Sequence, residues 1–359
     1  MPHLLDVTML WSENSGGVRR YLTTKQAWLE AHTMWHHTIV APGAHGHGRL
    51  SIRGWPLPFS GGYRVPLNRH KGARALLAQR PDLIEVGDPY RLAWSALDAT
   101  RRLHIPLVGF CHSNVVAMAD RFGGRLSARM ARRYLTRLYE QFDLVLAPSQ
   151  SMRAKLLDWG IRHVAHQPLG VDTDVFHPGQ RDEAWRQELG LPEGSRILVY
   201  AGRFGPEKNL DVLAEAVSLL GAPYEFVAIG AGPCPPQGPR TTVLPFTNDR
   251  SGLARVLASA DAFVHAGDQE TFGLSALEAL ACACPVVACS QGALGELVNE
   301  HIGVRVDVLR PSSFAQAIEY LFARNQGELR QAARQFALQH QWDNAMTHLM
   351  QRYQNLLTR

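Results

Sequence analysis

The sequence predicts an α/β protein with two domains, each built on a parallel β-sheet. Short runs of β-branched residues and leucine alternate with stretches whose apolar residues recur at helical spacing, which is typical of strands and helices in a parallel sheet. A loop-like stretch at residues 170–180 interrupts the alternation, which resumes at residue 196. The chain has 359 residues, more than one ordinary core needs, and suits two domains of about 150 to 200 residues. We therefore expect a cleft between two domains.

In the first half of the chain, strands are expected where apolar runs are short and are followed by turn residues. The pair Gly16 and Gly17 separates the first strand from a stretch of helical periodicity at residues 18–31. Residues 49–66 have no regular pattern and are expected to be irregular. The expected strands are residues 4–10, 36–42, 82–86, 106–110 and 142–149.

The second half repeats the pattern and ends in helices. Ligands of open α/β sheets bind beyond the carboxyl ends of the strands, where loops and helix N-termini gather, so the site residues are expected there. The expected strands are residues 196–202, 225–232, 262–267 and 285–289, and the expected helices are residues 209–221, 251–261, 273–281, 328–340 and 342–357.

The composition is that of a globular protein, with 46% hydrophobic and 19% charged residues. No run of about 18 uninterrupted apolar residues is present, and residues 1–17 lack the basic region of a signal peptide. We expect a cytoplasmic protein. Residues 1–180 contain 22 Lys and Arg against 13 Asp and Glu, which indicates an anionic surface or substrate for this half. No nucleic-acid-binding motif accompanies this charge, so nucleic acid is not an expected partner.

Two cations flank an expected helix start in the second half. Arg203 follows the strand 196–202, and Lys208 follows after four residues that include Pro206, which is expected at or near the first turn of a helix. The guanidinium offers a planar fork for phosphate oxygens, the ammonium a mobile point charge, and the free amides of the helix start further donors. A solvated basic loop is the alternative interpretation.

The most informative stretch is residues 267–281. Glu270 precedes an expected helix whose first turn contains Thr271, Phe272 and Gly273, and Glu278 lies on the apolar stripe of that helix. A carboxylate on that stripe needs hydrogen-bond donors, which the vicinal hydroxyls of a ribose would supply. Gly273 would let backbone amides approach a diphosphate. The alternative is a helix edge at which Glu278 reaches solvent or caps a neighbouring strand.

Taken together, several stretches resemble family four of the retaining GT-B glycosyltransferases, and the resemblance covers nearly the whole chain. It implies two Rossmann-like domains whose parallel sheets face each other across a cleft, with the donor between them. The implied N-terminal, acceptor-side domain is residues 1–175, the nucleotide-sugar-binding domain is residues 176–340, and residues 341–359 form a helix that crosses back to the first domain. The stretches that carry the resemblance are residues 170–178, 201–216, 226–233, 258–281 and 285–289.

The resemblance also implies roles for individual residues. It places Arg203 and Lys208 on the diphosphate, Glu278 on the ribose and Glu270 on the transferred sugar, and His112 corresponds to a histidine that reaches the donor sugar in relatives. The implied catalytic residues are His112, Arg203, Lys208 and Glu270. The implied donor-binding residues are Gly16, Gly17, Arg203, Lys208, Glu270, Thr271, Phe272, Gly273, Leu274 and Glu278.

No metal and no cofactor are expected. Asp172 and Asp174 imitate the Asp-x-Asp metal site of a different glycosyltransferase fold, but they lie in the interdomain segment 170–178, whose family equivalents bind no metal. A simple NAD enzyme is disfavoured because Gly16 and Gly17 are not followed by the third glycine and the ribose-binding acid of that motif.

We therefore expect a retaining, metal-independent hexosyltransferase that uses a UDP- or GDP-sugar and an acceptor hydroxyl. Two alternatives stay open. A GT-B-fold epimerase of nucleotide sugars would keep the donor site but lack an acceptor groove, and a non-catalytic nucleotide-sugar binding module would lack turnover altogether.

A basic segment bears on the acceptor. Six arginines in residues 121–137 surround apolar residues in a pattern that suits the anionic face of a membrane. We expect a lipid-linked or membrane-presented glycan acceptor and a peripheral contact with the inner face of an anionic membrane. The alternative is a solvated helix packed on the sheet. The apolar residues of the pattern are Leu126, Met130, Leu135 and Leu138, and the arginines are Arg121, Arg125, Arg129, Arg132, Arg133 and Arg137.

Overall fold

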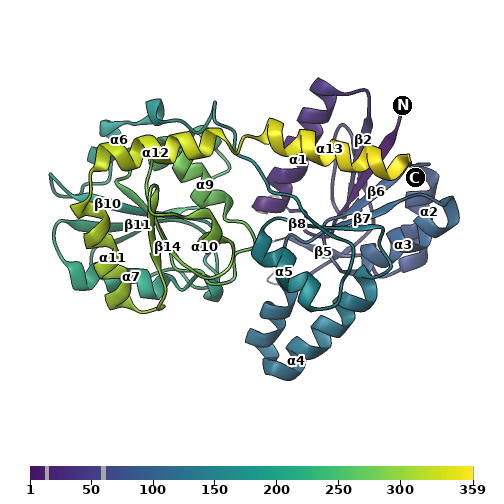
Figure 1. Ribbon diagram of the computed structural model, residues 1–359, viewed down its shortest axis with the longest axis horizontal. Coiled ribbons are helices and arrows are strands. Elements are labelled where there is room, and N and C mark those ends of the chain that lie inside the picture. The colour runs from purple at the N-terminus through teal and green to yellow at the C-terminus, as the bar shows by residue number, and fades with distance from the viewer. Residues whose placement is uncertain (13–15, 58–61, 359) are drawn as a thin grey trace. The chain divides into compact units, whose positions relative to one another are not determined.

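The structure is a computed structural model that describes residues 1–12, 16–57 and 62–358. The chain divides into two compact units. Unit 1 consists of Met1–Pro168 together with Asp343–Arg359, and unit 2 consists of Leu169–Trp342. Each unit contains one parallel sheet with helices packed against it, which confirms the predicted α/β class (Figure 1).

The sheet of unit 1 has seven parallel strands in the order β3-β2-β1-β6-β7-β8-β9. The stretch 49–66, expected to be irregular, contributes the edge strand β3 and a small antiparallel pair, β4 with β5. The strands are β1 (His3–Val7), β2 (His36–Ala41), β3 (Arg49–Ser51), β4 (Trp55–Pro56), β5 (Arg64–Val65), β6 (Leu83–Val86), β7 (Leu107–Phe110), β8 (Leu144–Ala147) and β9 (Val164–His166).

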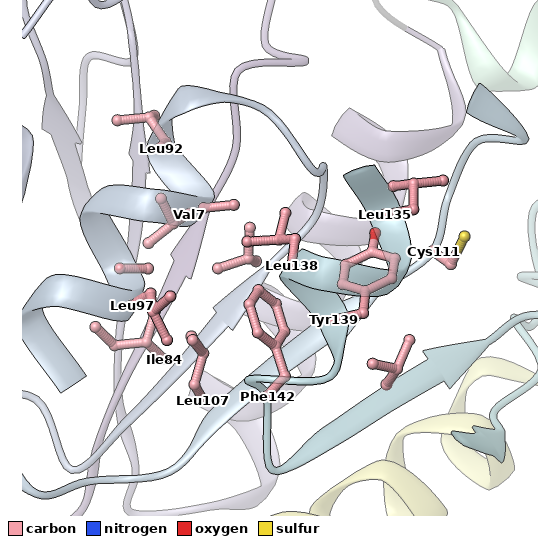
Figure 2. Close-up of a cluster of buried hydrophobic side chains, with 14 of the residues drawn as sticks. Val7, Ile84, Leu92, Leu97, Leu107, Cys111, Leu135, Leu138, Tyr139 and Phe142 are labelled. Carbon is pink, nitrogen blue, oxygen red and sulfur yellow. The ribbon is translucent and has the colours of Figure 1, made fainter. Parts of the chain in front are cut away.

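The helices of unit 1 cover this sheet. The fully buried residues of α4 come from its C-terminal part, while Val115 and Val116 at its start are partly buried against the same core. Figure 2 shows Leu135, Leu138 and Tyr139 of α4 among buried side chains from β6, β7 and α3. Within α4, Gly124 has φ +67° and ψ −170°, which breaks the helix into two segments. The helices are α1 (Gly17–His32), α2 (Arg69–Ala78), α3 (Arg91–Leu103), α4 (Val115–Tyr139), α5 (Gln150–Asp158) and α13 (Trp342–Leu357).

This packing corrects part of the predicted amphipathic pattern. Leu126 and Met130 are 71% and 64% exposed, as a surface face requires, but Leu135 and Leu138 lie in the core of unit 1. The sequence period could not separate the two pairs, because a helix that packs on a sheet at one end and leaves it at the other changes its buried face along its length.

A buried cation, Lys25 of α1, joins α13 to the core of unit 1. Its ammonium donates to Asp6 Oδ1 on β1 at 2.9 Å, to Glu85 Oε1 on β6 at 3.0 Å and to the Tyr353 hydroxyl of α13 at 2.7 Å. All four side chains are at most 1% exposed. At the surface, Trp28 Nε1 of α1 also donates to Asp343 Oδ1 of α13 at 2.9 Å.

The two carboxylates around Lys25 differ in protonation. Lys25 and the Asp6–His37 hydrogen bond hold the pKa of Asp6 well below its usual range despite burial. Burial and the neighbouring Asp6 raise the pKa of Glu85 to about 7, although Lys25 opposes that rise. The cluster therefore contains one carboxylate that stays charged, Asp6, and one carboxyl group, Glu85, whose pKa lies near neutrality.

The sheet of unit 2 has six parallel strands in the order β12-β11-β10-β13-β14-β15. This is the doubly wound order in which the first strand, β10, is central and the connections leave it in opposite directions. The strands are β10 (Arg196–Ala201), β11 (Tyr224–Gly230), β12 (Thr241–Pro245), β13 (Ala262–His265), β14 (Val286–Cys289) and β15 (Gly303–Val306).

Helices cover the sheet of unit 2 and place its core between β10, β11, β13 and β14 and the helices α7 and α11. Two single-turn 3₁₀ helices, η1 and η2, complete the unit. The helices are η1 (Pro178–Gln180), α6 (Glu183–Glu188), η2 (Pro206–Lys208), α7 (Leu210–Leu220), α8 (Arg250–Ser259), α9 (Leu274–Ala281), α10 (Ala293–Leu297), α11 (Pro311–Ala323) and α12 (Gln326–Leu338).

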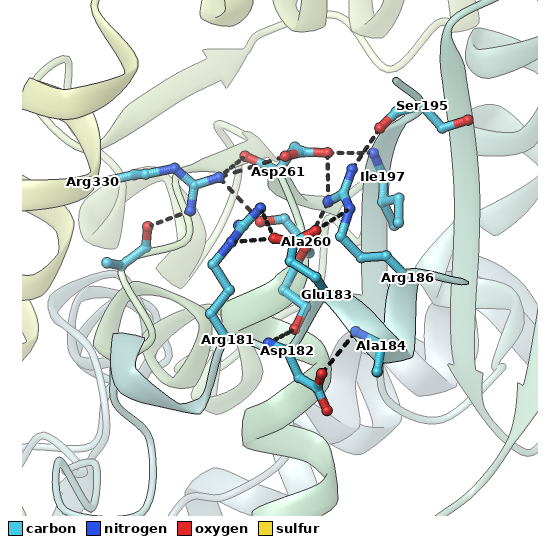
Figure 3. A network of polar contacts seen from close by, with 12 residues as sticks. Arg181, Asp182, Glu183, Ala184, Arg186, Ser195, Ile197, Ala260, Asp261 and Arg330 are labelled. Atoms are coloured by element: carbon cyan, nitrogen blue, oxygen red, sulfur yellow. Dashed lines mark hydrogen bonds and ion pairs between the residues drawn. The ribbon is translucent and has the colours of Figure 1, made fainter. Parts of the chain in front are cut away.

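A polar network centred on Asp261 links the amino ends of strands β10 and β13 within unit 2 (Figure 3). Asp261 Oδ2 accepts from Ile197 N at 2.7 Å and from Arg186 Nη1 at 3.1 Å, and Arg186 Nη2 also donates to Ser195 O at 2.6 Å. Arg330 of α12 lies on the other side, with Nη2 3.7 Å from Asp261 Oδ1. The network fixes the starts of β10 and β13 and leaves the opposite, carboxyl edge of the sheet to carry the candidate site.

Candidate active site

The candidate site of unit 2 lies where the strand order reverses. The strand β10 lies between β11 and β13, so the connections that follow β10 and β13 lead in opposite directions, which is where ligands of open α/β sheets bind. Arg203 and Lys208 follow β10, and Glu270 follows β13. The fold therefore brings together residues that are more than 60 positions apart in sequence.

The loop after β10 holds Arg203 against Glu207. Arg203 Nη2 and Glu207 Oε1 form an ion pair, and the Tyr200 hydroxyl donates to the carbonyl oxygen of Arg203 at 3.0 Å. The Arg203 side chain is 59% exposed, so the guanidinium stays accessible to a ligand.

Pro206 does not lie in the first turn of the helix that follows it, although α7 starts within one residue of the expected range 209–221. Pro206 opens only the 3₁₀ turn η2, and α7 starts at Leu210 because Asn209 adopts left-handed backbone angles, φ +49° and ψ +46°. Asn209 Nδ2 donates to Ala266 O at 3.0 Å, which ties this junction to the end of β13. The sequence pattern indicates a helix start at Pro206. It contains no information about the tertiary hydrogen bond from Asn209 to Ala266, which accompanies the later start of the helix.

Lys208, Glu270 and His265 form the polar centre of the site. Lys208 Nζ forms an ion pair with Glu270 Oε1, and the same oxygen lies 3.3 Å from Nε2 of His265. Lys208 and His265 together hold the pKa of Glu270 well below its usual range and outweigh the effect of burial, so the carboxylate is charged at neutral pH. Burial lowers the pKa of His265, so this imidazole is neutral.

The helix after Glu270 agrees with the expected range 273–281 to within one residue, but its first turn does not contain the residues predicted for it. Thr271, Phe272 and Gly273 precede α9 and do not form its first turn, because Gly273 has φ +96° and serves as the N-cap of a helix that starts at Leu274. A Cβ at position 273 would lie 2.7 Å from Leu294 Cδ2, so the position requires glycine on two counts. The amides of the first turn of α9 are therefore presented at the carboxyl edge of the sheet.

Glu278 lies on the buried side of α9, as its place on the apolar stripe predicts. It is 2% exposed, and its flanking residues Leu277 and Ala279 are fully buried. A buried carboxylate at the second turn of a helix that starts at the candidate site is consistent with a ligand hydroxyl partner, and that role stays a prediction.

In unit 1 the predicted residues lie at the carboxyl edge of the other sheet. Gly16 is the exposed N-cap of α1 and Gly17 its first residue, while residues 13–15 just before them lie outside the described residues. His112 follows β7 and stacks on Phe110 at a ring-centre distance of 4.2 Å, with Tyr21 at 5.0 Å on another side. Burial and the nearby Lys25 lower the pKa of His112 to about 3, so it is neutral.

Two residues of these edges were missed from the sequence. Asp88 follows β6, and its carboxylate accepts from the Thr8 hydroxyl at 2.8 Å and from Met9 N at 2.6 Å, which fixes the loop after β1 that leads toward Gly16. His265 ends β13 beneath Glu270. The available signal was their position, because each polar residue ends or directly follows a buried strand.

Asp172, the first residue of the Asp-x-Asp sequence, stabilises a turn through its carboxylate. Asp172 Oδ1 accepts from Asp174 N and Val175 N at 3.2 and 3.1 Å, and Asp172 Oδ2 accepts from Arg250 Nη2 at 2.7 Å. The carboxylate therefore closes a turn at the start of unit 2.

Comparison with known proteins bears on the family. The glycosyl transferases group 1 family matches residues 181–340, and glycosyltransferase family 4 matches residues 15–175. A Mycobacterium tuberculosis protein named GDP-mannose-dependent alpha-(1-6)-phosphatidylinositol dimannoside mannosyltransferase is 32% identical over 337 residues, which covers 87% of this chain and 86% of that protein. The chain belongs to glycosyltransferase family four. The suspected family is thus confirmed.

Other relatives and the solved structures agree with this assignment. A GDP-mannose-dependent alpha-mannosyltransferase of Mycolicibacterium smegmatis is 32% identical over 288 residues, covering 78% of this chain and 75% of that protein. Sucrose-phosphate synthase from Thermosynechococcus elongatus has a TM-score of 0.81 at 20% identity with full coverage of both chains. Anabaena HepE in complex with UDP and glucose has a TM-score of 0.80 at 18% identity, covering 97% of this chain and 98% of that one. The fold of this glycosyltransferase is therefore GT-B, as predicted.

Proposed function

We propose that this glycosyltransferase is a retaining, metal-independent hexosyltransferase that uses GDP-mannose as its donor. The observation that carries the proposal is the Lys208–Glu270–His265 centre at the reversal of strand order in unit 2, with Arg203 exposed beside it. The names of the two mannosyltransferase relatives favour GDP-mannose over other nucleotide sugars. The acceptor contributes a hydroxyl group.

In the proposed reaction, the bond between the anomeric carbon and the diphosphate oxygen breaks, and a bond to the acceptor oxygen forms on the same face of the sugar. The acceptor proton passes to the departing phosphate oxygen. Negative charge grows on that oxygen during bond cleavage, and Arg203, Lys208 and the amides at the start of α9 stabilise it.

The two glutamates have separate roles in this proposal. Glu270 is charged and accepts hydrogen bonds from hydroxyls of the transferred sugar, and Glu278 accepts from the ribose hydroxyls. The backbone around Thr271, Phe272, Gly273 and Leu274 completes the donor site. Gly16, Gly17 and His112 are the donor contacts predicted for unit 1, with neutral His112 able to exchange hydrogen bonds without attracting phosphate.

The donor assignment predicts a specific pattern of stabilisation. GDP-mannose at 100 times its dissociation constant should raise the unfolding free energy by about 2.7 kcal/mol, whereas UDP-glucose and ADP-glucose at the same concentration should give less. Differential scanning fluorimetry with and without EDTA measures both the donor preference and the independence from metal. A larger shift with a different nucleotide sugar would reject GDP-mannose, and a shift abolished by EDTA would reject metal independence.

Product analysis then separates transferase from epimerase. A transferase yields GDP together with an α-mannoside when an acceptor is supplied, and proton NMR of the anomeric centre shows retention. Release of GDP with an epimerised free sugar, and with no glycoside, is the outcome expected of the epimerase. Binding without any turnover is the outcome expected of a binding module.

We further propose that the acceptor is lipid-linked or presented at a membrane. The relative with 32% identity over 337 residues carries a phosphatidylinositol dimannoside in its name. No helix in the described part of the chain is long and apolar enough to cross a bilayer. A contact with the membrane in this proposal is therefore peripheral.

The exposed face of α4 is the surface that fits this contact. Leu126 and Met130, one turn apart after the break at Gly124, are 71% and 64% exposed, and Phe122 before it is 79% exposed. The exposed arginines Arg121, Arg125, Arg129, Arg132 and Arg133 surround them. Apolar side chains can enter the headgroup boundary while arginines pair with anionic lipids, at about 1 kcal/mol for each cation near the surface. Anionic lipids such as phosphatidylserine are concentrated in the cytoplasmic leaflet of a membrane.

This contact predicts selective vesicle binding. Wild-type protein should float with phosphatidylserine-containing vesicles and not with phosphatidylcholine vesicles. The variant Phe122→Ser with Leu126→Ser should bind at least about tenfold more weakly, since each side chain loses apolar burial of about 1.5 kcal/mol or more. Leu219→Ser, at a position 61% exposed on α7 of unit 2, is the matched control and should bind as wild type. Equal binding to both lipids, or to neither, would reject the contact.

A further inference from the structure

His265 occupies a fully enclosed place beneath the candidate site. It is the last residue of β13, and its side chain is 2% exposed. The ring Nδ1 lies 3.0 Å from the amide nitrogen of Gly267, whose N–H can only donate. Nδ1 must therefore be the unprotonated ring nitrogen, and the proton of the neutral imidazole is on Nε2.

This tautomer directs the second ring nitrogen at Glu270. Nε2 lies 3.3 Å from Glu270 Oε1, so its N–H donates to the carboxylate. The orientation is fixed from two further sides. A Cβ at position 267 would lie 2.6 Å from Cε1 of His265, so only glycine permits the approach, and the Tyr200 ring packs edge-on against the imidazole at 5.3 Å.

Both side chains that donate to Glu270 contact the same carboxylate oxygen. Lys208 Nζ and His265 Nε2 contact Oε1, and within residues 1–12, 16–57 and 62–358 no donor to Oε2 is recorded. The Glu270 side chain is 17% exposed, so it is not fully enclosed, in contrast to His265.

We propose that His265 is a positioning residue, which holds Glu270 Oε1 through Nε2–H so that Oε2 is aimed at a hydroxyl of the transferred sugar. The inference rests on the proposed function, because it assumes that Glu270 binds the donor sugar. It assigns a role to a residue that touches neither the sugar nor the diphosphate.

A neutral donor suits this role better than a second cation. Lys208 faces two anions when a donor is bound, the Glu270 carboxylate and the diphosphate, and its mobile ammonium can shift toward the phosphate. His265 carries no charge and is locked by Gly267, so it keeps its hydrogen bond to Glu270 when Lys208 moves. The carboxylate therefore stays oriented during the step in which negative charge grows on the leaving group.

The test compares two replacements of His265. His265→Phe keeps the packing against Tyr200 but removes the donor, and should lower kcat by about 10- to 100-fold, the scale expected when a catalytic group is misplaced. His265→Gln can place an amide N–H near the position of Nε2 and should recover most of that loss. Calorimetric affinity for GDP alone should stay within about threefold of wild type in both, because GDP lacks the sugar.

A pH profile distinguishes positioning from a general loss of structure. In the described part of the chain, the titratable groups that interact electrostatically with Glu270 are Lys208, His265 and Tyr200. Since the His265 hydrogen bond lowers the pKa of Glu270, its loss raises that pKa, and the acid limb of kcat/KM should move to higher pH in His265→Phe but not in His265→Gln. His340→Phe, at a partly buried histidine that stacks on Phe336, is the control and should leave both kcat and the acid limb unchanged.

Nitrogen-15 NMR of the free protein tests the hydrogen bond without turnover. The Nε2–H tautomer is expected for His265, and an Nδ1–H tautomer would overturn the proposal, as would GDP-mannose and GDP affinities that change equally in His265→Phe. If wild-type protein transferred no sugar, the proposed function would fail, while the tautomer and the two affinities would still decide the role of His265.

Discussion

Replacing Lys208 with alanine is expected to lower kcat/KM for sugar transfer by about 100- to 1,000-fold, the range found when one preorganised donor to a developing anion is removed. Lys208 neutralises Glu270 in the free protein and, in the proposed reaction, the leaving diphosphate. Its removal therefore weakens GDP binding and lowers kcat together, because the charge it stabilises is present in the ground state and grows in the transition state. Steady-state kinetics beside calorimetric binding of GDP measures both effects.

The control for Lys208→Ala is a second ion pair of unit 2. Arg240 Nη1 donates to Glu225 Oε1 at 2.6 Å, and Glu225 is nearly buried, so Arg240→Ala also leaves a carboxylate without its cation. This variant should lose comparable stability and keep its kinetics. Full GDP affinity in Lys208→Ala, or equal losses of activity in the two variants, would show that Lys208 does not bind the diphosphate.

Replacing Lys25 with methionine is expected to lower the unfolding free energy by about 3 to 5 kcal/mol, as when one partner of a buried ion pair is removed. Methionine fills a similar volume but leaves Asp6 and Glu85 buried without the ammonium that contacts both. Chemical denaturation measures the loss. Lys71→Met, at an exposed position of α2 in the same unit, should change stability by less than about 0.5 kcal/mol.

The loss in Lys25→Met should grow with pH. The pKa of Glu85 is raised to about 7 in the folded protein, so its contribution to stability is complete at low pH and is lost as pH rises through 7. Because Lys25 lowers that pKa, the variant has a still higher value, and deprotonating Glu85 at pH 8 costs it more than wild type. An equal destabilisation at pH 6 and pH 8 would contradict the prediction that removing Lys25 raises the pKa of Glu85.

The candidate site shows which structural features the sequence patterns predicted and which they did not. The apolar stripe predicted that Glu278 is buried. The ends of the expected strands predicted that Arg203, Lys208 and Glu270 lie at the carboxyl edge of a sheet. The expected helices 209–221 and 273–281 agree with α7 and α9 to within one residue at their starts, but the placement of Pro206 and of Thr271 in their first turns was wrong. In each case a residue with left-handed backbone angles, Asn209 or Gly273, begins the helix later, and its conformation depends on neighbours far away in sequence.

The surface of α4 shows the same limit. Periodicity identified Leu126 and Met130 as apolar residues among arginines, and both are exposed. It could not tell them from Leu135 and Leu138, because burial depends on where the helix leaves the sheet and not on the helix alone.

The sequence by itself determined the α/β class, the order of most strands and helices, and the family of this glycosyltransferase, because these follow from local periodicity and from residues adjacent in the chain. Only the tertiary structure decided which charges meet. Lys25 joins Asp6, Glu85 and Tyr353 of α13, and Lys208 and His265 share one oxygen of Glu270. A lysine or a histidine in a sequence has no assigned partner. Its partners, its tautomer and its pKa are set when the fold removes water and brings particular donors and acceptors within reach.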